Sequence, residues 1–265
     1  MTHAASERSK MSEGLQSFAR RWVVPFIDPR RLLTLLFLPR FVSEWRSYRR
    51  GSSERVAARD LYPCLADRTA HTPFDPHYFF QGAWIARKLA ARRPVAHVDI
   101  ASSVMTVSVF SAFVPTTFVD FRPLAVDLDN LESRAGDVTR LPFADHSIAS
   151  LSCLHVIEHI GLGRYGDPLD SDGAEKALAE LQRVAAPGGR LYLSTPVGRE
   201  RVCFNAHRVF NPLSIVAAMP LMRLASFALV DDAGRFLEDV TPTSCADQDY
   251  SCGLFEFEKI LVGNE

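Results

Sequence analysis

Several signals that would quickly assign a chain to a class are missing from this sequence of 265 residues. The formal net charge is only −1, which gives no overall attraction to nucleic acid. Five cysteines show no paired metal-ligand spacing, and their odd number without a secretory signal indicates free thiols in a reducing compartment. Residues 1–13 are polar, lack an apolar signal core and are expected to be disordered. The sequence therefore predicts a cytoplasmic protein that does not bind nucleic acid.

The apolar run at residues 32–38 falls far short of the roughly 20 residues that a helix needs to cross a bilayer. Its surroundings are unusual, because residues 20–50 contain eight arginines and only two acidic residues, Asp28 and Glu44. Basic flanks around a short apolar segment suit a helix that lies in the interface of an anionic membrane. An accessory helix docked on the main domain, with its arginines in solvent, explains the same composition. The sequence leaves both interpretations open.

The remaining composition is that of an ordinary soluble globular protein, with 47% hydrophobic and 23% charged residues. The length fits one large α/β domain with an extension. We expect a basic, helical extension over residues 1–72 and the main domain over residues 73–265. Helical patterns alternate with short apolar strands in the main domain, which predicts a doubly wound, mostly parallel sheet.

Periodicity and capping signals place the elements of the main domain. Asp75-Pro76 begins a helix that should run to about residue 92, because a capping carboxylate precedes a proline at the first helical position. Residues 253–260 alternate between apolar and polar, which predicts a late strand with one solvated side, added antiparallel to the edge of the sheet. We further expect helices at 104–113 and 174–185, a turn at 187–189, and strands at 97–100, 117–120, 124–126, 148–154 and 190–195.

Three aspartates stand at the carboxyl ends of predicted strands: Asp99, Asp120 and Asp137. In open α/β sheets, this edge is where ligands bind. Asp120 follows Asp99 by 21 residues, a distance that suits a carboxylate accepting from the two hydroxyls of a ribose. Asp137 is placed to accept from the exocyclic amine of an adenine. A solvated strand-end aspartate is the alternative for each, but three in order are stronger evidence than any one.

The turn after the first strand contains no glycine. Residues 101–103 are Ala101, Ser102 and Ser103, which are small enough to let a ligand approach the main chain. A plain tight turn explains them equally well. A left-handed backbone at Ala101 would cost about 1 kcal/mol.

Two histidines and a carboxylate, His155, Glu158 and His159, follow the strand at 148–154. On a helix, the two histidines would share one face as in a zinc motif, but without a third ligand we predict no metal site. His155 is better explained as a residue of a cofactor pocket. Glu158 is a secondary catalytic candidate, with a structural role as the alternative.

His207 is the leading acid–base candidate. It follows the strand at 190–195 in a polar loop with Asn205 and Arg208. An unperturbed imidazole pKa near 6.5 suits a general base. The alternative is that Asn205 and His207 only brace the loop.

Residues 161–166 match the letters of a dinucleotide-binding fingerprint, with glycines at 161, 163 and 166. The context is wrong, because Asp167-Pro168 follows where a helix should begin. A lid or substrate loop is the better interpretation.

The order of these features resembles the class I S-adenosylmethionine-dependent methyltransferases, over roughly residues 73–262. The resemblance rests on Asp99, Asp120, Gly136-Asp137-Val138-Thr139-Arg140-Leu141-Pro142-Phe143, His155-Val156-Ile157-Glu158-His159, Pro187-Gly188-Gly189-Arg190-Leu191 and Thr195-Pro196. Residues 161–168 and 204–209 more narrowly resemble a bacterial methyltransferase-like family of poorly known substrate, often associated with surface polysaccharide synthesis.

The resemblance implies S-adenosylmethionine as the cofactor and a seven-stranded sheet whose last strand is reversed. It also implies cofactor contacts at Ala101, Asp120, Asp137, Val138 and His155, to which the first strand and its turn add Asp99 and Ser102. The family normally has two or three glycines in that turn, and this chain has none.

We therefore expect a methyltransferase that acts on a hydroxyl or similar group of a glycan precursor, lipid-linked or free. The main alternative is a catalytically silent domain of the same fold that serves as a binding or scaffold protein, which the glycine-free turn favours. A nucleotide-sugar enzyme built on the same sheet is a weaker third hypothesis. The sequence leaves the methyl acceptor and the oligomeric state open.

Overall fold

The computed structural model describes residues 29–54 and 56–260 of the chain. The chain divides into two compact units, Met1–Pro73 and Phe74–Glu265. The predicted disorder at residues 1–13 and the first part of the basic segment, residues 20–28, lie outside the described residues. No helix in the described ranges combines the length and the apolar character needed to cross a membrane.

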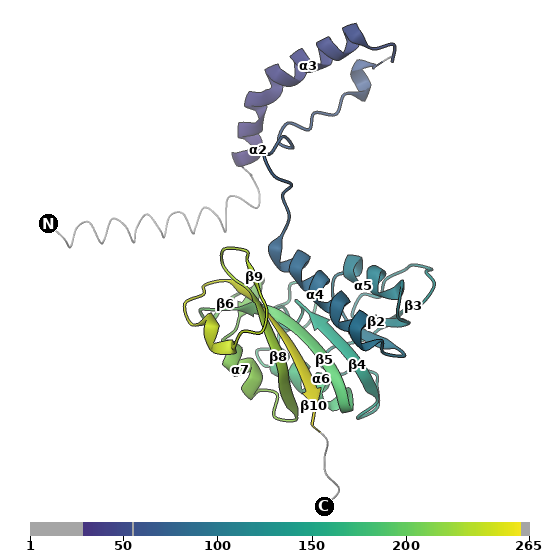
Figure 1. Cartoon of the computed structure of the whole chain (residues 1–265), viewed down its shortest axis with the longest axis vertical. Coiled ribbons are helices and arrows are strands. Elements are labelled where there is room, and N and C mark those ends of the chain that lie inside the picture. Colours follow the sequence, from purple (N-terminus) through teal and green to yellow (C-terminus); the bar gives the residue numbers. More distant parts are fainter. Residues whose placement is uncertain (1–28, 55, 261–265) are drawn as a thin grey trace, which may run out of the picture. The chain divides into compact units, whose positions relative to one another are not determined.

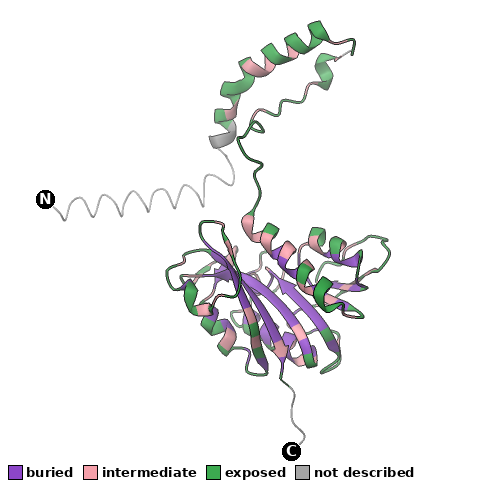
Figure 2. Cartoon of the chain, viewed as in Figure 1, coloured by how far each residue is buried: buried purple, intermediate pink, exposed green. Residues whose placement is uncertain are grey.

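The first unit consists of short helices with exposed side chains. Its elements are α2 (Pro29–Thr34), η1 (Leu35–Phe37), α3 (Leu38–Gly51) and η2 (Ala58–Asp60). No described residue of η1, α3 or η2 is buried, and Figure 2 colours α3 as exposed or intermediate. The large apolar side chains of residues 32–38 are all exposed, from 40% for Leu38 to 75% for Leu36. Within its own unit this apolar run is therefore uncovered.

The second unit is built on a twisted sheet in the order β3-β2-β1-β4-β5-β10-β8-β9 (Figure 1). Strands β1 to β5 run parallel, and β10 runs antiparallel to both β5 and β8. The mostly parallel sheet with a reversed last strand is thus confirmed; a two-residue eighth strand extends one edge. The bounds are β1 His97–Ile100, β2 Thr116–Asp120, β3 Leu131–Ala135, β4 Ile148–Leu154, β5 Ala185–Val197, β8 Met222–Val230, β9 Phe236–Leu237 and β10 Ser251–Lys259.

Helices cover both faces of this sheet, so its central strands are buried (Figure 2). On one face, α4 and α5 contribute to a core cluster that contains Trp84, Phe110 and Tyr192. On the other face, α6 and α7 contribute to a cluster that contains Leu181, Ile215 and Leu191. Neighbouring residues of β5 therefore point to opposite cores, as a doubly wound sheet requires. The elements are α4 Pro76–Arg92, α5 Val104–Ser111, α6 Gly173–Val184, α7 Pro212–Ala217, η3 Pro242–Cys245 and a separate hairpin of β6 Arg201–Cys203 and β7 His207–Val209.

The start of α4 confirms the predicted cap. The Asp75 carboxylate accepts hydrogen bonds from the backbone N–H groups of His77 (2.9 Å) and Tyr78 (3.4 Å), and Pro76 is the first helical residue. The helix ends where Arg93 adopts a left-handed conformation, with φ at 47°. These contacts fix the first turn of α4, which bears on the site described below.

The predicted third strand at 124–126 is wrong. The strand lies at β3 instead, and its residues are mostly polar and partly exposed. Because β3 is the edge strand and pairs only with β2, it needs little apolar surface and carries a weak sequence signal. The loop before it is tied to the strand where the Leu124 N–H donates to the Ser133 hydroxyl at 2.9 Å.

The late strand is present but lies inside the sheet, not at its edge. β10 runs between β5 and β8, so neither of its sides is solvated. The polar residue Glu256 is 3% exposed and forms ion pairs with Lys88 (2.8 Å) and Arg92 (2.6 Å) of α4. The apolar–polar alternation thus reflects a buried ion-pair network on one face.

The predicted turn at 187–189 is part of an irregular segment at the beginning of β5. Ile148 of β4 pairs with Ala185, whereas Ser150 pairs with Arg190. Residues 186–189 of β5 therefore have no pairing partner on β4. Gly188, which is one of these four residues, has a φ of 73°. Strand pairing resumes at Arg190, where the sequence predicted the strand to begin.

Candidate active site

A cavity of about 350 Å³ opens at the carboxyl ends of the parallel strands. It lies where β1 and β4 are adjacent and the chain connections diverge, the place where open α/β sheets bind ligands. The lining residues come from the carboxyl ends of four strands and from the loop that leads into α6. They are Ile100, Ala101, Ser102 and Val104 at β1; Val119, Asp120, Phe121 and Arg122 at β2; Gly136, Asp137, Val138 and Thr139 after β3; His155, Val156, His159 and Ile160 after β4; and Gly161, Tyr165, Asp167, Pro168, Asp170 and Gly173 from the loop and the first residue of α6.

Six of the seven residues predicted to contact the cofactor line this cavity: Ala101, Ser102, Asp120, Asp137, Val138 and His155. Asp99, the seventh, is fully buried behind the first turn. Its carboxylate accepts from the Ser102 N–H at 3.0 Å and from the Ser152 hydroxyl. Burial raises the pKa of Asp99 to about 6, against the opposing effect of these hydrogen bonds. Asp99 therefore positions the turn from behind instead of lining the cavity.

Two non-glycine residues of the cavity wall have left-handed backbones. Ala101 has a φ of 54° and His155 a φ of 55°, each directly after a strand. The Ala101 N–H donates to Val119 O (2.8 Å) and the His155 N–H to Ser194 O (2.9 Å), which holds both bends. Such strain costs about 1–3 kcal/mol per residue and is concentrated at functional sites. The glycine-free turn thus takes the conformation that glycine would adopt most easily.

In the carboxylates of Asp120 and Asp137, one oxygen accepts hydrogen bonds from residues of the adjoining turn. Asp120 Oδ1 accepts from the Arg122 N–H (2.6 Å), and Asp137 Oδ1 accepts from the N–H and hydroxyl of Thr139 (2.8 and 2.7 Å). Within the described part of the chain, Oδ2 of each makes no hydrogen bond. Val138, 7% exposed, adds an apolar surface beside them. The cavity therefore offers two fixed acceptors beside an apolar wall.

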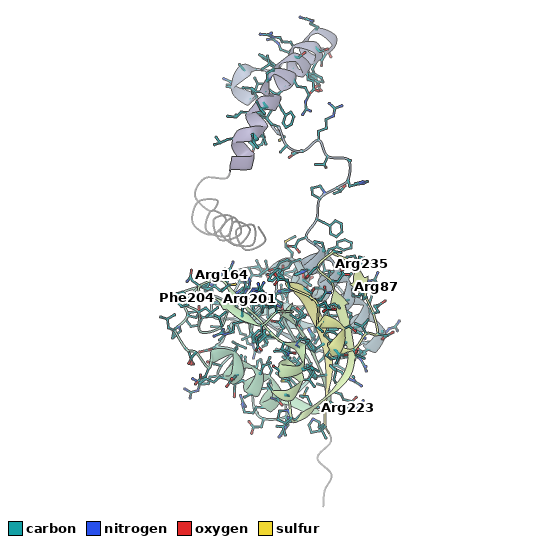
Figure 3. All side chains as sticks on the ribbon, turned by 90° about the vertical axis from the view of Figure 1, so that its left-hand side faces the viewer. Arg87, Arg164, Arg201, Phe204, Arg223 and Arg235 are labelled. Atoms are coloured by element: carbon teal, nitrogen blue, oxygen red, sulfur yellow. The ribbon has the colours of Figure 1, made fainter. Side chains whose placement is uncertain are left out.

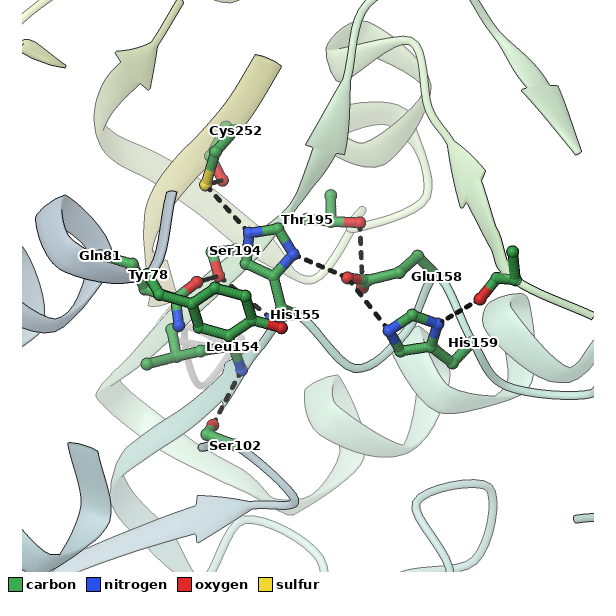
Figure 4. Close-up of polar contacts among 12 residues, drawn as sticks. Tyr78, Gln81, Ser102, Leu154, His155, Glu158, His159, Ser194, Thr195 and Cys252 are labelled. Carbon is green, nitrogen blue, oxygen red and sulfur yellow. Dashed lines mark hydrogen bonds and ion pairs between the residues drawn. The ribbon is translucent and has the colours of Figure 1, made fainter. Parts of the chain in front are cut away.

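His155 is the centre of a buried polar cluster (Figure 4). Its Nδ1 lies 2.8 Å from Glu158 Oε1 and its Nε2 lies 3.3 Å from Cys252 Sγ. Burial lowers the pKa of His155, but Cys252 and Glu158 outweigh burial and the net pKa lies well above the ordinary value. At neutral pH His155 is therefore an imidazolium, and both of its nitrogens are already engaged.

Glu158, the second catalytic candidate, is buried in this polar cluster. It is 1% exposed, does not line the cavity, and also contacts Thr195 Oγ1 (3.3 Å) and His159 Nε2 (3.7 Å). The rings of His155 and His159 both lie within ion-pair distance of Glu158, in the bend and turn after β4 and not on a helix face. In the part of the chain that the structure describes, no three His, Cys, Asp or Glu side chains are arranged to hold a metal ion.

His207 begins β7, half-buried and outside the cavity lining. Its ring packs against Tyr250, with ring centroids 5.1 Å apart. Burial and the nearby His159 lower its pKa, so the ring is neutral at physiological pH. Its two neighbours in the predicted cluster brace loops: Asn205 Nδ2 donates to Leu162 O (3.5 Å) and Arg208 Nη1 to Ile160 O (2.6 Å).

The loop of residues 161–173 forms one side of the cavity. Gly161, Gly163 and Gly166 all have positive φ, and a Cβ at Gly161 would lie 1.9 Å from the Asp170 carbonyl oxygen. The Tyr165 ring contacts the guanidinium of Arg122 (4.7 Å) from the β2 side and that of Arg164 (5.1 Å). Arg164 also donates to Ala206 O at 3.1 Å, which ties this loop to the β6–β7 hairpin whose exposed Phe204 is labelled beside it in Figure 3.

Sequence reasoning missed the rings that the first turn of α4 brings to His155. His77 and Tyr78 stack against the His155 ring, with centroids 5.8 and 5.4 Å away. Tyr250, which precedes β10, also stacks on His77, with ring centroids 5.5 Å apart. The only local signal was the Asp75-Pro76 cap, which predicts where the helix begins but not what its first turn touches.

A family model described as a Caenorhabditis protein of unknown function, DUF268, matches residues 130–234, less than half of the chain. No curated protein matched. One similar solved structure is the complex between the Haloferax volcanii Trm112 methyltransferase activator and a methyltransferase. The match has 17% sequence identity, covers 72% of this chain and 92% of that chain, and has a TM-score of 0.49. A second is the N-methyltransferase NodS from Bradyrhizobium japonicum in complex with S-adenosyl-L-homocysteine, with 12% identity over 70% of this chain and 88% of that chain and a TM-score of 0.48. A third is the YcgJ protein from Bacillus subtilis, with 14% identity over 69% of this chain and 99% of that chain and a TM-score of 0.46. None of these matches bears on the narrower polysaccharide-linked resemblance.

Proposed function

We propose that this protein is an S-adenosylmethionine-dependent methyltransferase. The observation that carries the proposal is the pair of free carboxylate oxygens, on Asp120 and Asp137, at the ends of adjacent strands in one cavity. When bound, S-adenosylmethionine supplies an electrophilic methyl group. Asp120 would accept from the ribose hydroxyls and Asp137 from the adenine amine, while Val138 covers the apolar face of the base.

The charge and size of the cavity fit this cofactor. Four aspartates line the cavity against two cations, Arg122 and the protonated His155, and this negative balance favours a ligand with a cationic sulfonium. Its volume of about 350 Å³ falls at the small end of the range for ligand pockets. At the first turn, where the methyltransferases that the sequence resembles have glycine, the cavity is lined by the small residues Ala101 and Ser102.

For the acceptor, we propose a hydroxyl or similar group of a glycan precursor, lipid-linked or free. The support for this finer statement is the sequence resemblance of residues 161–168 and 204–209. The competing hypothesis is a silent domain that has lost the cofactor, for which the strained turn at Ala101 is the argument.

Titration calorimetry with S-adenosylmethionine and S-adenosylhomocysteine separates these hypotheses. We expect binding by the wild type and a loss of about tenfold or more in Asp137→Ala and in Asp120→Ala, because a hydrogen bond to a charged group contributes about 1.5–3 kcal/mol. Asp129→Ala, which removes an exposed carboxylate outside the cavity, is the matched control and should bind normally. Absence of heat with the wild type would favour the silent domain.

We further propose that the first unit contacts an anionic membrane surface. Its support is the exposed apolar run at 32–38, which leads into α3, and the exposed basic residues Arg49 and Arg50 in the last turn of that helix. Co-sedimentation of the full chain should rise with anionic lipid and fall with salt. Leu36→Glu should reduce it severalfold, whereas Val95→Glu, at a 95% exposed position of the second unit, should not. Equal binding by both variants would refute this role.

A further inference from the structure

Two arginines approach the ring of Tyr165 at one side of the cavity. The guanidinium of Arg122, from the segment after β2, lies 4.7 Å from the ring centroid, and that of Arg164 lies 5.1 Å from it. Arg122 and Tyr165 both line the cavity, and all three residues are exposed to solvent. Residues that line a cavity and also reach solvent lie at its opening. This arginine pair, Arg122 and Arg164, therefore flanks Tyr165 where the cavity opens.

Neither member of the arginine pair has a carboxylate partner within the described part of the chain. The Arg122 guanidinium forms no hydrogen bond or ion pair there, and the ring it contacts is that of Tyr165. Arg164 donates through Nη1 to Ala206 O at 3.1 Å, which fixes its direction, while its Nε and Nη2 have no hydrogen-bond partner among the described residues. The carboxylate of Asp167, in the same loop as Arg164, accepts instead from two backbone N–H groups at 2.9 and 3.2 Å. Both positive charges are therefore left without a counter-ion.

The arginine pair makes the opening of the cavity positive. Its two guanidinium groups lie within about 10 Å of each other, since both lie close to one ring centroid, and salt screens their repulsion only in part at that distance. Burial lowers the pKa of His159 and of His207, and the positive charge of Arg164 lowers both further. By contrast, Arg201, labelled beside Arg164 in Figure 3, is paired with Asp249 at 3.3 Å. A bound anion would relieve the repulsion within the pair.

We propose that the arginine pair binds a phosphate group of the methyl acceptor. This inference rests on the proposed methyltransferase function and names the class of acceptor, a phosphate ester. Each guanidinium can donate two parallel N–H groups to a pair of anionic oxygens. A phosphate monoester has three terminal oxygens and a charge of about −1.5 to −2 at neutral pH, which matches two guanidinium groups, whereas a carboxylate matches one. The aspartates inside the cavity thus suit the cationic cofactor, and the arginine pair at its opening suits an anionic acceptor.

Two exposed aromatic side chains accompany the arginine pair. Phe121 precedes Arg122, lines the cavity and is 57% exposed. Phe204, in the turn of the β6–β7 hairpin, is 72% exposed and is labelled near Arg164 in Figure 3. The hydrogen bond from Arg164 to Ala206 O ties this hairpin turn to the arginine. An aromatic face packs against a sugar ring or an isoprenoid chain, so a sugar phosphate and a lipid phosphate are the two sources of the phosphate group.

Calorimetry on the full chain tests this inference with two phosphate esters, glucose 1-phosphate and farnesyl phosphate. Each ester is titrated into the wild type, Arg122→Gln, Arg164→Gln and Arg87→Gln. Glutamine removes the positive charge and keeps most of the side-chain length. Arg87→Gln is the matched control, because Arg87 is exposed on α4, has no ion pair among the described residues and lies away from Arg164 in Figure 3. Titration of S-adenosylhomocysteine into the same proteins measures the cofactor site separately.

We expect at least one of the two esters to bind the wild type, and both Arg122→Gln and Arg164→Gln to lower its affinity about tenfold or more. Arg87→Gln should bind the ester normally, and every variant should keep its S-adenosylhomocysteine affinity within twofold. If only glucose 1-phosphate shows this dependence, the acceptor is a sugar phosphate. If only farnesyl phosphate shows it, the acceptor is a lipid phosphate.

Binding of neither ester, or binding that Arg122→Gln and Arg164→Gln leave unchanged, would overturn the inference. The proposed function would still stand if the wild type binds S-adenosylhomocysteine. A loss of S-adenosylhomocysteine affinity in Arg122→Gln, with the affinity for the ester unchanged, would assign this arginine to the cofactor and overturn the inference as well. Arginine-dependent binding of an ester by a wild type that does not bind S-adenosylhomocysteine would overturn the proposed function while the phosphate site stands.

Discussion

Replacing Ala101 by glycine should stabilise this protein, although glycine usually destabilises. Ala101 has a φ of 54°, where a Cβ approaches the neighbouring carbonyl oxygen at a cost of about 1–2 kcal/mol. Glycine removes that cost but makes the unfolded chain more flexible, which offsets about 0.4–1 kcal/mol. The difference leaves a net gain of about 0.5–1 kcal/mol. For a domain of 150–250 residues, that gain corresponds to a rise in melting temperature of about 1–4 °C.

Thermal unfolding followed by circular dichroism measures this shift. The matched control is Ala112→Gly, at an exposed position after α5 with an ordinary helical φ of −67°. There only the unfolded-state term acts, so Ala112→Gly should lower stability by about 0.4–1 kcal/mol. The two variants should therefore move in opposite directions. If Ala101→Gly destabilises as much as Ala112→Gly does, the turn is not strained and the reasoning fails.

Three further predictions concern buried groups. The pKa of Asp99 in the folded state, about 6, lies above its ordinary value of 3.8, so the folded state binds the proton more tightly than the unfolded state does. The free energy of unfolding should therefore fall by about 3 kcal/mol as the pH rises from 4 to above 6. Urea titrations at several pH values measure this slope, which should be smaller in Asp99→Asn. Gly161→Ala should cost more than 1 kcal/mol and lower the melting temperature, because its Cβ would meet the Asp170 carbonyl at 1.9 Å, and an unchanged melt would contradict the loop geometry. Glu256→Gln should destabilise by about 1–3 kcal/mol in urea unfolding, because the cations of α4 and β5 lose their buried counter-charge while they themselves remain partly in solvent. A loss below about 1 kcal/mol would mean that solvent already screens them.

Local signals were sufficient wherever structure depends on near neighbours in the chain. The cap at Asp75 and the buried stripe of α6, with Leu178 and Leu181, were predictable because both rest on spacings of two to four residues. The placement of Asp120 and Asp137 in one cavity was also predictable. The carboxyl ends of parallel strands meet at the same edge of a sheet, so their order in the sequence was enough.

Edge and interior strands could not be told apart in this way. β3 is polar because an edge strand buries little, and β10 alternates because its polar side faces the cations of α4. The alternation of apolar and polar residues shows that the two faces of a strand differ in polarity. It does not show whether the polar face is in contact with solvent or with a buried ion pair. That distinction depends on which strands lie on either side.

The sequence by itself determined the doubly wound sheet, the edge at which the cavity opens and the carboxylates available there. Only the tertiary structure decided which polar residues face the cavity and in which charge state. It turned Asp99 and Glu158 away from the cavity, and it brought His77 and Cys252 to His155 from opposite parts of the chain. These outcomes depend on contacts between residues far apart in sequence. The pKa of an imidazole is set by burial and by the charges around it, and no local pattern encodes either.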